Sequence, residues 1–421
     1  MRSIMLWLCK TNWHSLSRIS VRSVCSLLFL LASCEIDAKE SGPLKVFVLV
    51  GQSNMQGHAQ VKTLDAMRLN PSVAPLLDDL IDGDGKPKTL QQVWISSIGS
   101  AEEIRQGALT TGFGAADRRP KIGPEYSFGI YMHQMLDEPF VIIKAAWGGK
   151  SLHTDFRPPS AGPYEFNQEQ LDAFSKQQRD LDKMRSEKDA ATGRNYRLMI
   201  EHVKSILDSL PNDCPLYETK LGYELAGMVW FQGWNDMVDR GTYPNRDQPG
   251  GYDQYGELLS VFISDVRRDL DSPKLPVVIG VLGVGGPTAE YGPSQQRYKV
   301  MHESFRQAMA SPAKRAEFTG TVVPVYTEEY WDREMVRLRQ IEERIRPSRE
   351  EIEAQKKAGT ITEQESRDKI ESLYQSSFDP TELTYLRESV SNGDYHYMGS
   401  AAIIAPIGKA FAEAMYAMIG E

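Results

Sequence analysis

Several short groups of polar residues and glycines in this chain have the side-chain types that acyl-transfer chemistry needs. The first is Gly51-Gln52-Ser53-Asn54-Met55-Gln56-Gly57, where glycines bracket a serine directly after an apolar run. A tight turn at such a place lifts the hydroxyl out of a sheet and points nearby backbone N–H groups forward. The turn therefore suits Ser53 as a nucleophile whose oxyanion is held by its own N–H group. The alternative is that Ser53 only caps the next helix.

Two further groups follow later apolar runs. In Trp147-Gly148-Gly149-Lys150-Ser151, the two glycines allow a ligand to approach the backbone closely. In Gln232-Gly233-Trp234-Asn235-Asp236, a side-chain amide could donate to a developing oxyanion. Each group alone is also compatible with an ordinary turn at the end of a strand.

The last group is Asn392-Gly393-Asp394-Tyr395-His396, near the end of the chain. A carboxylate beside a histidine can hold one imidazole nitrogen and leave the other to accept a serine proton. Asp394 would then orient His396, the general base. The alternative is a surface Asp and His beside a glycine turn. No His/Cys/Asp cluster has metal-ligand spacing, so we expect neither a metal nor another cofactor.

The elements that would position these groups can be predicted from hydropathy. Nearly continuous apolar runs indicate strands buried on both faces of a parallel sheet, and they are Leu44–Val50, Phe140–Ala146, Leu225–Phe231, Leu275–Leu282 and Gly320–Tyr326. Helical spacing lies between them, at Glu125–Leu136, Tyr196–Leu210 and Tyr255–Leu270, and follows the last run at Ser400–Ile419. This alternation predicts an α/β fold. Ligands bind beyond the carboxyl ends of strands in open parallel sheets, so the polar groups should converge at one edge.

Two segments are predicted as insertions in a domain that spans residues 44–421. Residues 332–372 are dense in both signs of charge with a sparse apolar stripe, which indicates a solvated helical hairpin. A hairpin that binds a protein partner is the alternative. Residues 61–119 contain the turn Asp82-Gly83-Asp84-Gly85 and form the second predicted insertion.

Composition narrows the class of protein. The chain has 421 residues, of which 41% are hydrophobic and 25% charged, close to a soluble globular average. This composition excludes collagen, a polytopic membrane protein and a wholly disordered chain. The formal net charge of −9 disfavours nucleic acid as a partner.

The N-terminus has the layout of an export signal. Residues 1–33 carry four basic residues and no acidic one, followed by the apolar run Val24–Leu31, which is too short to span a bilayer. The run ends in Leu31-Ala32-Ser33-Cys34, which resembles a bacterial lipobox. We predict a signal peptide over 1–33, a lipidated Cys34 and a linker over 34–43. Ordinary signal cleavage nearby, or a buried apolar segment, is the alternative.

Taken together, these groups resemble the SGNH (GDSL-like) hydrolase superfamily, and within it the sialate O-acetylesterase group related to carbohydrate esterase family six. The resemblance rests on Gly51–Gly57, Gly123-Pro124-Glu125, Lys144–Leu152, Gln232–Asp236 and Asp394–His396. It implies a three-layer α/β/α sandwich around a central parallel sheet, similar to flavodoxin.

The resemblance also implies residue roles. Ser53 would be the nucleophile, His396 the base and Asp394 its orienter. The oxyanion hole would combine the N–H groups of Ser53 and Gly149 with the amide of either Asn235 or Gln232. This chain departs from the family in two places: Trp234 replaces a Glu of the acetylesterase group, and only two residues separate Asp394 from His396. Asp379 is therefore a second candidate for the orienter. Glu125 is expected to support the start of a helix.

The sequence thus predicts an exported serine esterase, secreted or lipid-anchored in the cell envelope of a bacterium, that removes O-acetyl groups from sugars or polysaccharides. Gln52, His153 and Arg157 are candidates for substrate binding, although the sequence favours solvated surface residues for the last two. The expected partner is an acetylated carbohydrate, with the membrane contacted only through the lipid. The alternatives are a lipase or thioesterase of the same fold, and a surface protein that binds carbohydrate without catalysis.

Overall fold

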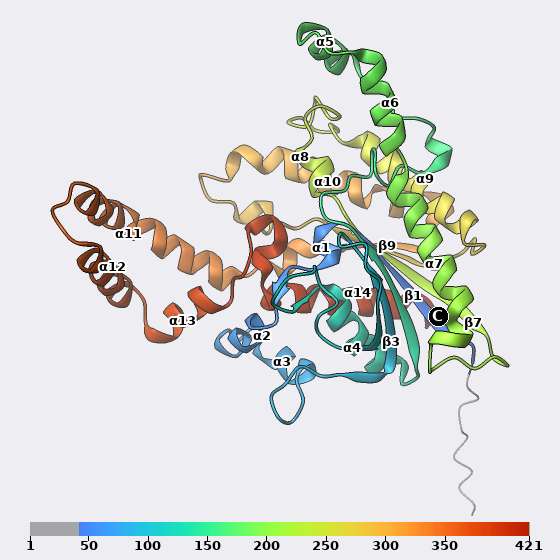
Figure 1. The fold of residues 1–421 in the computed structure, drawn as a ribbon, viewed down its shortest axis with the longest axis horizontal. Helices are drawn as coiled ribbons and strands as arrows, with labels where there is room; N and C mark the ends of the chain where they lie inside the picture. Colours follow the sequence, from blue (N-terminus) through green and yellow to red (C-terminus); the bar gives the residue numbers. More distant parts are fainter. Residues whose placement is uncertain (1–41, 421) are drawn as a thin grey trace, which may run out of the picture. The chain divides into compact units, whose positions relative to one another are not determined.

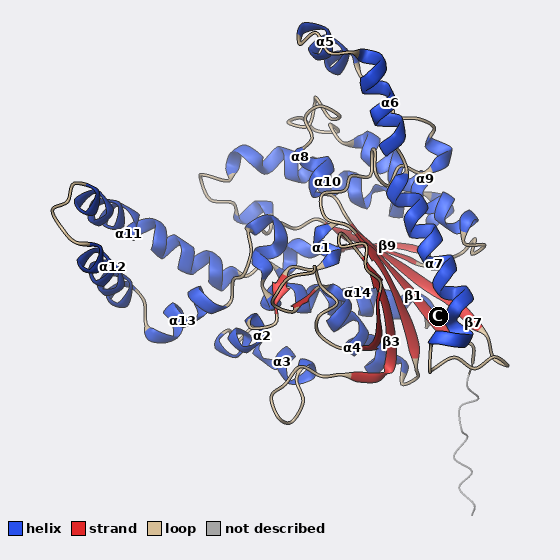
Figure 2. Cartoon of the chain, viewed as in Figure 1, coloured by secondary structure: helices blue, strands red, loops and turns tan. Residues whose placement is uncertain are grey.

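A sheet of seven strands forms the centre of the computed structural model, which describes residues 42–420 (Figure 1 and Figure 2). The strand order is β4-β3-β6-β1-β7-β8-β9, and every neighbouring pair is parallel except β3 and β4. The strands are β1 (Leu44–Gly51), β3 (Leu90–Ile98), β4 (Arg105–Leu109), β6 (Phe140–Ala146), β7 (Tyr223–Phe231), β8 (Val277–Val281) and β9 (Val322–Tyr326). The predicted signal peptide and Cys34 lie outside the described residues.

The inner strands are buried on both faces, as their apolar sequences predict. All of β6 is buried, and so is all of β1 except the half-buried Lys45. Strands of this kind need helices on both faces of the sheet. The five predicted strands are confirmed as β1, β6, β7, β8 and β9.

The segment 61–119 is predicted as an insertion, but the structure gives it two strands of the central sheet. β3 pairs with β6 in parallel, and β4 closes that edge of the sheet antiparallel to β3. The sequence of β3 hides this role because Ser96 and Ser97 interrupt its apolar run, although both serines are buried. A short antiparallel pair, β2 (Ala59–Gln60) with β5 (Lys121–Ile122), joins the two ends of the segment.

Two layers of helices cover the sheet and confirm the three-layer α/β/α architecture (Figure 1). On one face α4 (Pro124–Leu136) packs against α14 (Ala401–Ile419), and on the other lie α7 (Arg194–Asp213), α9 (Asp253–Asp269) and α10 (Lys299–Ala310). All four predicted helices are present. The shorter helices are α1 (Ser53–Gln56), α2 (Thr63–Ala66), α3 (Ala74–Leu80), α5 (Gln168–Lys176), α6 (Leu181–Ala191) and α8 (Trp234–Val238).

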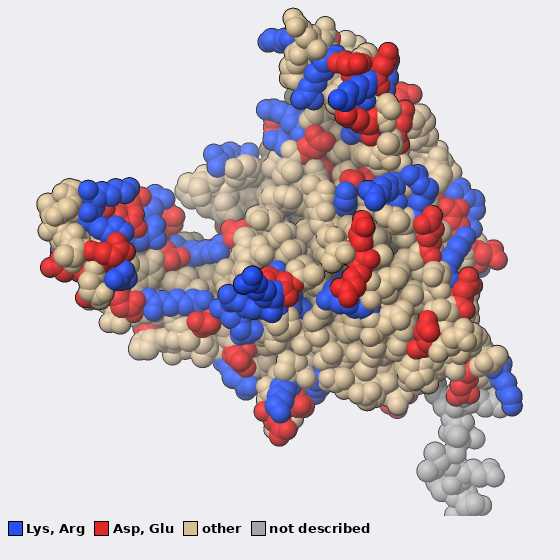
Figure 3. Space-filling model, in the orientation of Figure 1, with Lys and Arg blue, Asp and Glu red and all other residues tan. Residues whose placement is uncertain are grey.

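The predicted hairpin at 332–372 is helical. It consists of α11 (Arg333–Lys357) and α12 (Glu363–Ser377), which pack against each other, and α13 (Pro380–Glu388) follows. Its surface carries both signs of charge, as Figure 3 shows at the left of the view. The buried residues of α11 are Met335 and Leu338, both in its first two turns. The hairpin is therefore a charged arm that joins the core at its base.

Candidate active site

Three strand ends meet at one point on the edge of the sheet. Gly51, the last residue of β1, lies beside Ala146 of β6 on one side and Phe231 of β7 on the other. The three polar groups that follow these strands therefore come together. After β1 the chain builds one side of the sheet first and the other side from β7 onward, so β1 is the topological switch point. Open α/β sheets bind ligands at such a point.

Ser53 occupies the turn after β1 as the first residue of α1. The turn is tight because Gly51 packs so closely on the carbonyl of Phe231 that any side chain there would overlap it. Ser53 is buried, yet neither its N–H group nor its hydroxyl bonds another group within residues 42–420. Both groups are therefore available to the carbonyl of an ester.

A buried ion pair supports this turn from the core. Lys144 Nζ lies 2.6 Å from Glu125 Oε2, and both side chains are almost completely buried. Lys144 also donates to the carbonyl of Gln56, the last residue of α1, at 2.8 Å. Burial lowers the pKa of Lys144, while Glu125 opposes this shift. Glu125 accepts a hydrogen bond from the N–H group of Gly123 at 2.9 Å, which agrees with the role in helix support expected from the sequence.

The glycine loop after β6 lies beside Ser53. A methyl group built onto Gly148 would come within 3.9 Å of Ser53 Cβ. Gly149 has a left-handed φ of 73°, a conformation that favours glycine. Its N–H group makes no hydrogen bond in the part of the chain that the structure describes. Ser53 and Gly149 thus each offer an unpaired N–H group at this edge.

The two amides predicted for the oxyanion hole differ in their surroundings. Gln232 Nε2 donates to Asp236 Oδ2 at 2.6 Å, to the carbonyl of Lys150 at 3.0 Å and to Gln52 Oε1 at 3.2 Å, so the amide is fully engaged. The half-buried side chain of Asn235 makes no hydrogen bond within the described chain, where only its backbone N–H group is bonded. Of the two candidates, Asn235 therefore keeps a free donor.

Gln52 and Asp236 tie the three strand ends together. Gln52 is completely buried, and its Oε1 faces the backbone N–H groups of Gly233 and Asn235 at 3.4 Å. It therefore links the ends of β1 and β7, and its predicted contact with the substrate stays a prediction. The carboxylate of Asp236 is also buried and accepts from the N–H groups of Leu152 and His153 at 2.8 and 3.1 Å. Asp236 was not predicted as a site residue.

His396 lies on a short 3-10 segment, Asp394–Gly399, that contacts α1. Its Nδ1 is 3.0 Å from Asn392 Oδ1, and its ring stacks on that of His58 with 3.9 Å between the centroids. Burial, assisted by the charge of Lys121, lowers the pKa of His396 to about 4. The ring is therefore neutral at pH 7. With Nδ1–H donating to Asn392, Nε2 is left as a proton acceptor.

The structure does not bring Asp394 to the ring of His396. The Asp394 carboxylate accepts from Arg339 of the hairpin at 2.6 Å, and its side chain is 55% exposed. Asp379, the second candidate, caps the start of α13 by accepting from the N–H groups of Thr381 and Glu382. Asn392 takes the expected place of the carboxylate because the backbone of the segment folds back on itself. The carbonyl of Met398 accepts hydrogen bonds from the N–H groups of Ser391 and Asn392.

Asn54 and Asn392 are neighbours of the site to which the sequence analysis assigned no role, whereas the position of His58 just after Gly51–Gly57 indicated that it flanks the pocket. Both polar side-chain atoms of Asn54 are buried without a hydrogen-bond partner in the described chain. Asn392 and His58 bracket the His396 ring as described above. The signals available for the two asparagines were weak: Asn54 follows Ser53, and Asn392 precedes His396 by four residues.

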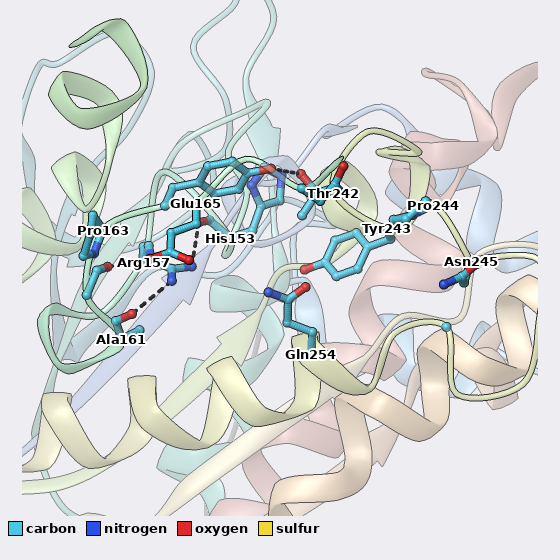
Figure 4. A pocket seen from close by; sticks show the side chains of 14 residues that line it. His153, Arg157, Ala161, Pro163, Glu165, Thr242, Tyr243, Pro244, Asn245 and Gln254 are labelled. Atoms are coloured by element: carbon cyan, nitrogen blue, oxygen red, sulfur yellow. Dashed lines mark hydrogen bonds between the residues drawn. The ribbon is translucent and has the colours of Figure 1, made fainter. Parts of the chain in front are cut away.

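His153 and Arg157 line a cavity of about 650 Å³ next to the glycine loop (Figure 4). Neither is an exposed surface residue, because His153 is buried and Arg157 is half-buried. His153 Nε2 is 3.0 Å from Asp239, and its Nδ1 is 2.6 Å from the Thr154 hydroxyl. Among residues 42–420, no three His, Cys, Asp or Glu side chains are grouped so that they could hold a metal ion.

Comparisons with known proteins show the family of the chain. A sequence model of the family described as carbohydrate esterase, sialic acid-specific acetylesterase, matches residues 43–317. A search of curated proteins finds no match. Among solved structures, a protein from Arabidopsis thaliana is 16% identical, with 68% of this chain and 86% of that chain covered and a TM-score of 0.37. A carbohydrate acetylesterase from Xanthomonas citri is 16% identical, with 64% and 48% covered and a TM-score of 0.34.

Proposed function

The chain belongs to the carbohydrate esterase family of sialic acid-specific acetylesterases and is an acetylesterase, and from that premise we propose that it removes O-acetyl groups from sugars through Ser53 and His396. The observation that carries this proposal is the position of Ser53. It lies at the topological switch point, next to the loop that carries Gly148 and Gly149, and within residues 42–420 its N–H group and hydroxyl and the N–H group of Gly149 have no hydrogen-bond partner.

The proposed reaction has two acyl-transfer steps. Ser53 Oγ forms a bond to the acetyl carbon, His396 Nε2 takes the hydroxyl proton, and the same proton passes to the sugar oxygen as that bond breaks. Water then attacks the acetyl-serine, gives its proton to His396, and acetate leaves as Ser53 Oγ is protonated again. The hydrogen bond between Nδ1 of His396 and Asn392 supports this assignment, because it fixes the tautomer in which Nε2 accepts.

The developing oxyanion would be held by three donors. These are the N–H groups of Ser53 and Gly149 and the side-chain amide of Asn235. One such donor contributes about 2.7–4 kcal/mol to transition-state stabilisation. Gln232 instead holds the loops in place through its three hydrogen bonds.

We also propose that the chain is exported and anchored through a lipid on Cys34. Support comes from the basic and apolar pattern of residues 1–33 and from Leu31-Ala32-Ser33-Cys34. Labelling with a radioactive fatty acid during expression in a bacterium tests this proposal. The parent should take up the label and Cys34→Ala should not; an unlabelled parent would count against the anchor.

The catalytic proposal is tested by acetate release from an O-acetylated sugar and from 4-nitrophenyl acetate. Ser53→Ala should lower kcat/KM by about 10³-fold or more on both substrates, because the nucleophile is lost. Ser264→Ala is a matched control, since the hydroxyl of Ser264 bonds only the carbonyl of Ser260 within α9. A Ser53→Ala protein that kept a tenth of the parent activity would refute the assignment.

A further inference from the structure

The glycine loop that follows β6 is held at both ends through its backbone. The N–H group of Trp147 donates to the carbonyl of Gly51 at 3.2 Å. The N–H group of Ser151 donates to the carboxylate of Asp155 at 2.8 Å. Between these ends, two consecutive glycines give the backbone a wide choice of conformations. The loop therefore needs a further contact if the N–H group of Gly149 is to keep one direction.

That contact comes from Ser100, just beyond the end of β3. The N–H group of Gly148 donates to Ser100 Oγ at 2.9 Å, and the same hydroxyl donates to Gln56 Oε1 at 3.3 Å. A serine hydroxyl can accept one bond while it donates another, so the two bonds are compatible. Gln56 ends α1, the helix that begins at Ser53. Ser100 thus links the glycine loop to the helix of the proposed nucleophile.

Close packing around the turn after β3 supports this link. A methyl group built onto Gly148 would lie 3.4 Å from Gln56 Oε1 and 3.5 Å from Ser100 Oγ. A methyl group built onto Gly99 would lie only 2.8 Å from the carbonyl oxygen of Ala146 and from the side-chain nitrogen of Gln56. The turn therefore packs directly on the end of β6 and on α1.

We propose that Ser100 is a positioning residue for the oxyanion hole. Its hydroxyl fixes Gly148, and through Gly148 it fixes the direction of the Gly149 N–H group relative to Ser53. In this role Ser100 contacts no reacting atom. The proposal rests on the function proposed above and adds to it a residue from the edge of the sheet that the sequence hides.

Ser100→Ala removes the anchor and should lower kcat for 4-nitrophenyl acetate by about tenfold. Complete loss of one oxyanion donor costs about 10²–10³ in kcat, and a donor that only loses its direction should cost part of this. KM should not change, because both acyl-transfer steps pass through an oxyanion and the donors act on the transition state. Ser100→Thr keeps the hydroxyl and should stay within about twofold of the parent. Ser100 is exposed, so neither substitution disturbs the buried core.

Inhibition by methylboronic acid separates a loss of transition-state stabilisation from a loss of folded enzyme. Ser53 Oγ would add to the boron atom, with the serine proton passing to His396, to give a tetrahedral anion shaped like the reaction intermediate. In Ser100→Ala the inhibition constant should rise by about the same factor as kcat falls. A smaller fraction of folded protein would lower the measured rate but would leave the inhibition constant unchanged.

Thr89→Ala is the matched control. It removes the exposed hydrogen bond between Thr89 and Thr110 at the other end of the β3–β4 pair, and it should leave kcat and the inhibition constant within about twofold of the parent. A Ser100→Ala protein with the parental kcat and inhibition constant would overturn the proposal, and so would an equal loss in Thr89→Ala. Hydrolysis that persists in Ser53→Ala would instead refute the proposed function itself, whatever the Ser100 variants do.

Discussion

The two halves of the proposed catalytic pair are supported in different ways. Ser53 belongs to a turn that is fixed to the buried centre of the sheet, with the Lys144–Glu125 ion pair beneath it. His396 belongs to a surface turn between α13 and α14, where Asp394 and Tyr395 are exposed. The nucleophile is thus held by the core of the domain, whereas the base is held by hydrogen bonds within a few residues of itself.

This difference predicts which substitutions should change stability and which should change catalysis. Substitutions of Lys144 or Glu125, beneath Ser53, should lower the free energy of unfolding, because the contacts of these residues also hold the sheet, α1 and α4 together. Substitutions around His396 should change the rate of catalysis or its pH dependence and should have little effect on stability. Three predictions test this division.

The largest effect is expected from Glu125→Gln. The substitution leaves the ammonium group of Lys144 buried without its counter-charge, and breaking a buried pair in this way costs about 3–5 kcal/mol. Urea unfolding followed by circular dichroism measures the loss in the free energy of unfolding. Glu290→Gln breaks the exposed pair with Arg333 and should cost less than about 1 kcal/mol. Equal losses in the two variants would contradict a supporting role for the buried pair.

A smaller effect, on catalysis alone, is expected from Asn392→Ala. Without the acceptor for Nδ1–H, the ring of His396 loses its orientation, and kcat should fall roughly tenfold, near the upper limit for a single hydrogen bond. KM should not change, and Asn392→Asp should restore kcat because a carboxylate accepts the same bond. Steady-state kinetics on an acetylated sugar measures both constants.

Asp394→Ala is the matched comparison for that variant. It removes only the exposed ion pair with Arg339, so kcat should stay within about twofold of the parent. The reverse order, with Asp394→Ala the more damaging variant, would restore Asp394 as the orienter of His396.

The smallest effect is expected from His58→Ala and concerns pH. The base must be neutral to accept the Ser53 proton, and because burial lowers the pKa of His396 to about 4, kcat/KM should fall only near pH 4. Removing the stacked ring lets water reach His396, so its pKa should rise toward 6.5 and the acid limb should move up by roughly one unit. His133→Ala, on α4, should leave the profile in place. A profile unchanged by His58→Ala would show that the stack does not exclude water.

The sequence alone predicts those elements whose structure follows from a local pattern of residue types. The runs that became β1 and β6 are apolar except for Lys45 and Lys144, and such nearly continuous apolar runs are typical of strands buried on both faces of a sheet. β3 escaped prediction because its buried serines resemble a surface segment. The convergence of Ser53 and Gly149 was also predictable, since it needs only the rule that parallel strands end at one edge.

The choice between Asp394 and Asn392 was not predictable in this way. Charge favours the aspartate, but the fold of the turn decides which side chain reaches the imidazole. Tyr397 and Met398 both have left-handed backbone angles, which nothing in their residue types indicates. The same limit applies to Asp236, whose importance depends on loops that meet only in the folded chain.

The central place of β1 has a consequence for the order in which the enzyme is assembled. β1 is made first, but its two neighbours are β6 and β7, and the residue proposed as the base follows only near the end of the chain. A growing chain therefore exposes Ser53 long before the partners of its strand have been synthesised, and such distant pairings form slowly. Under the proposed mechanism, a chain cut before His396 lacks the base and should not release acetate.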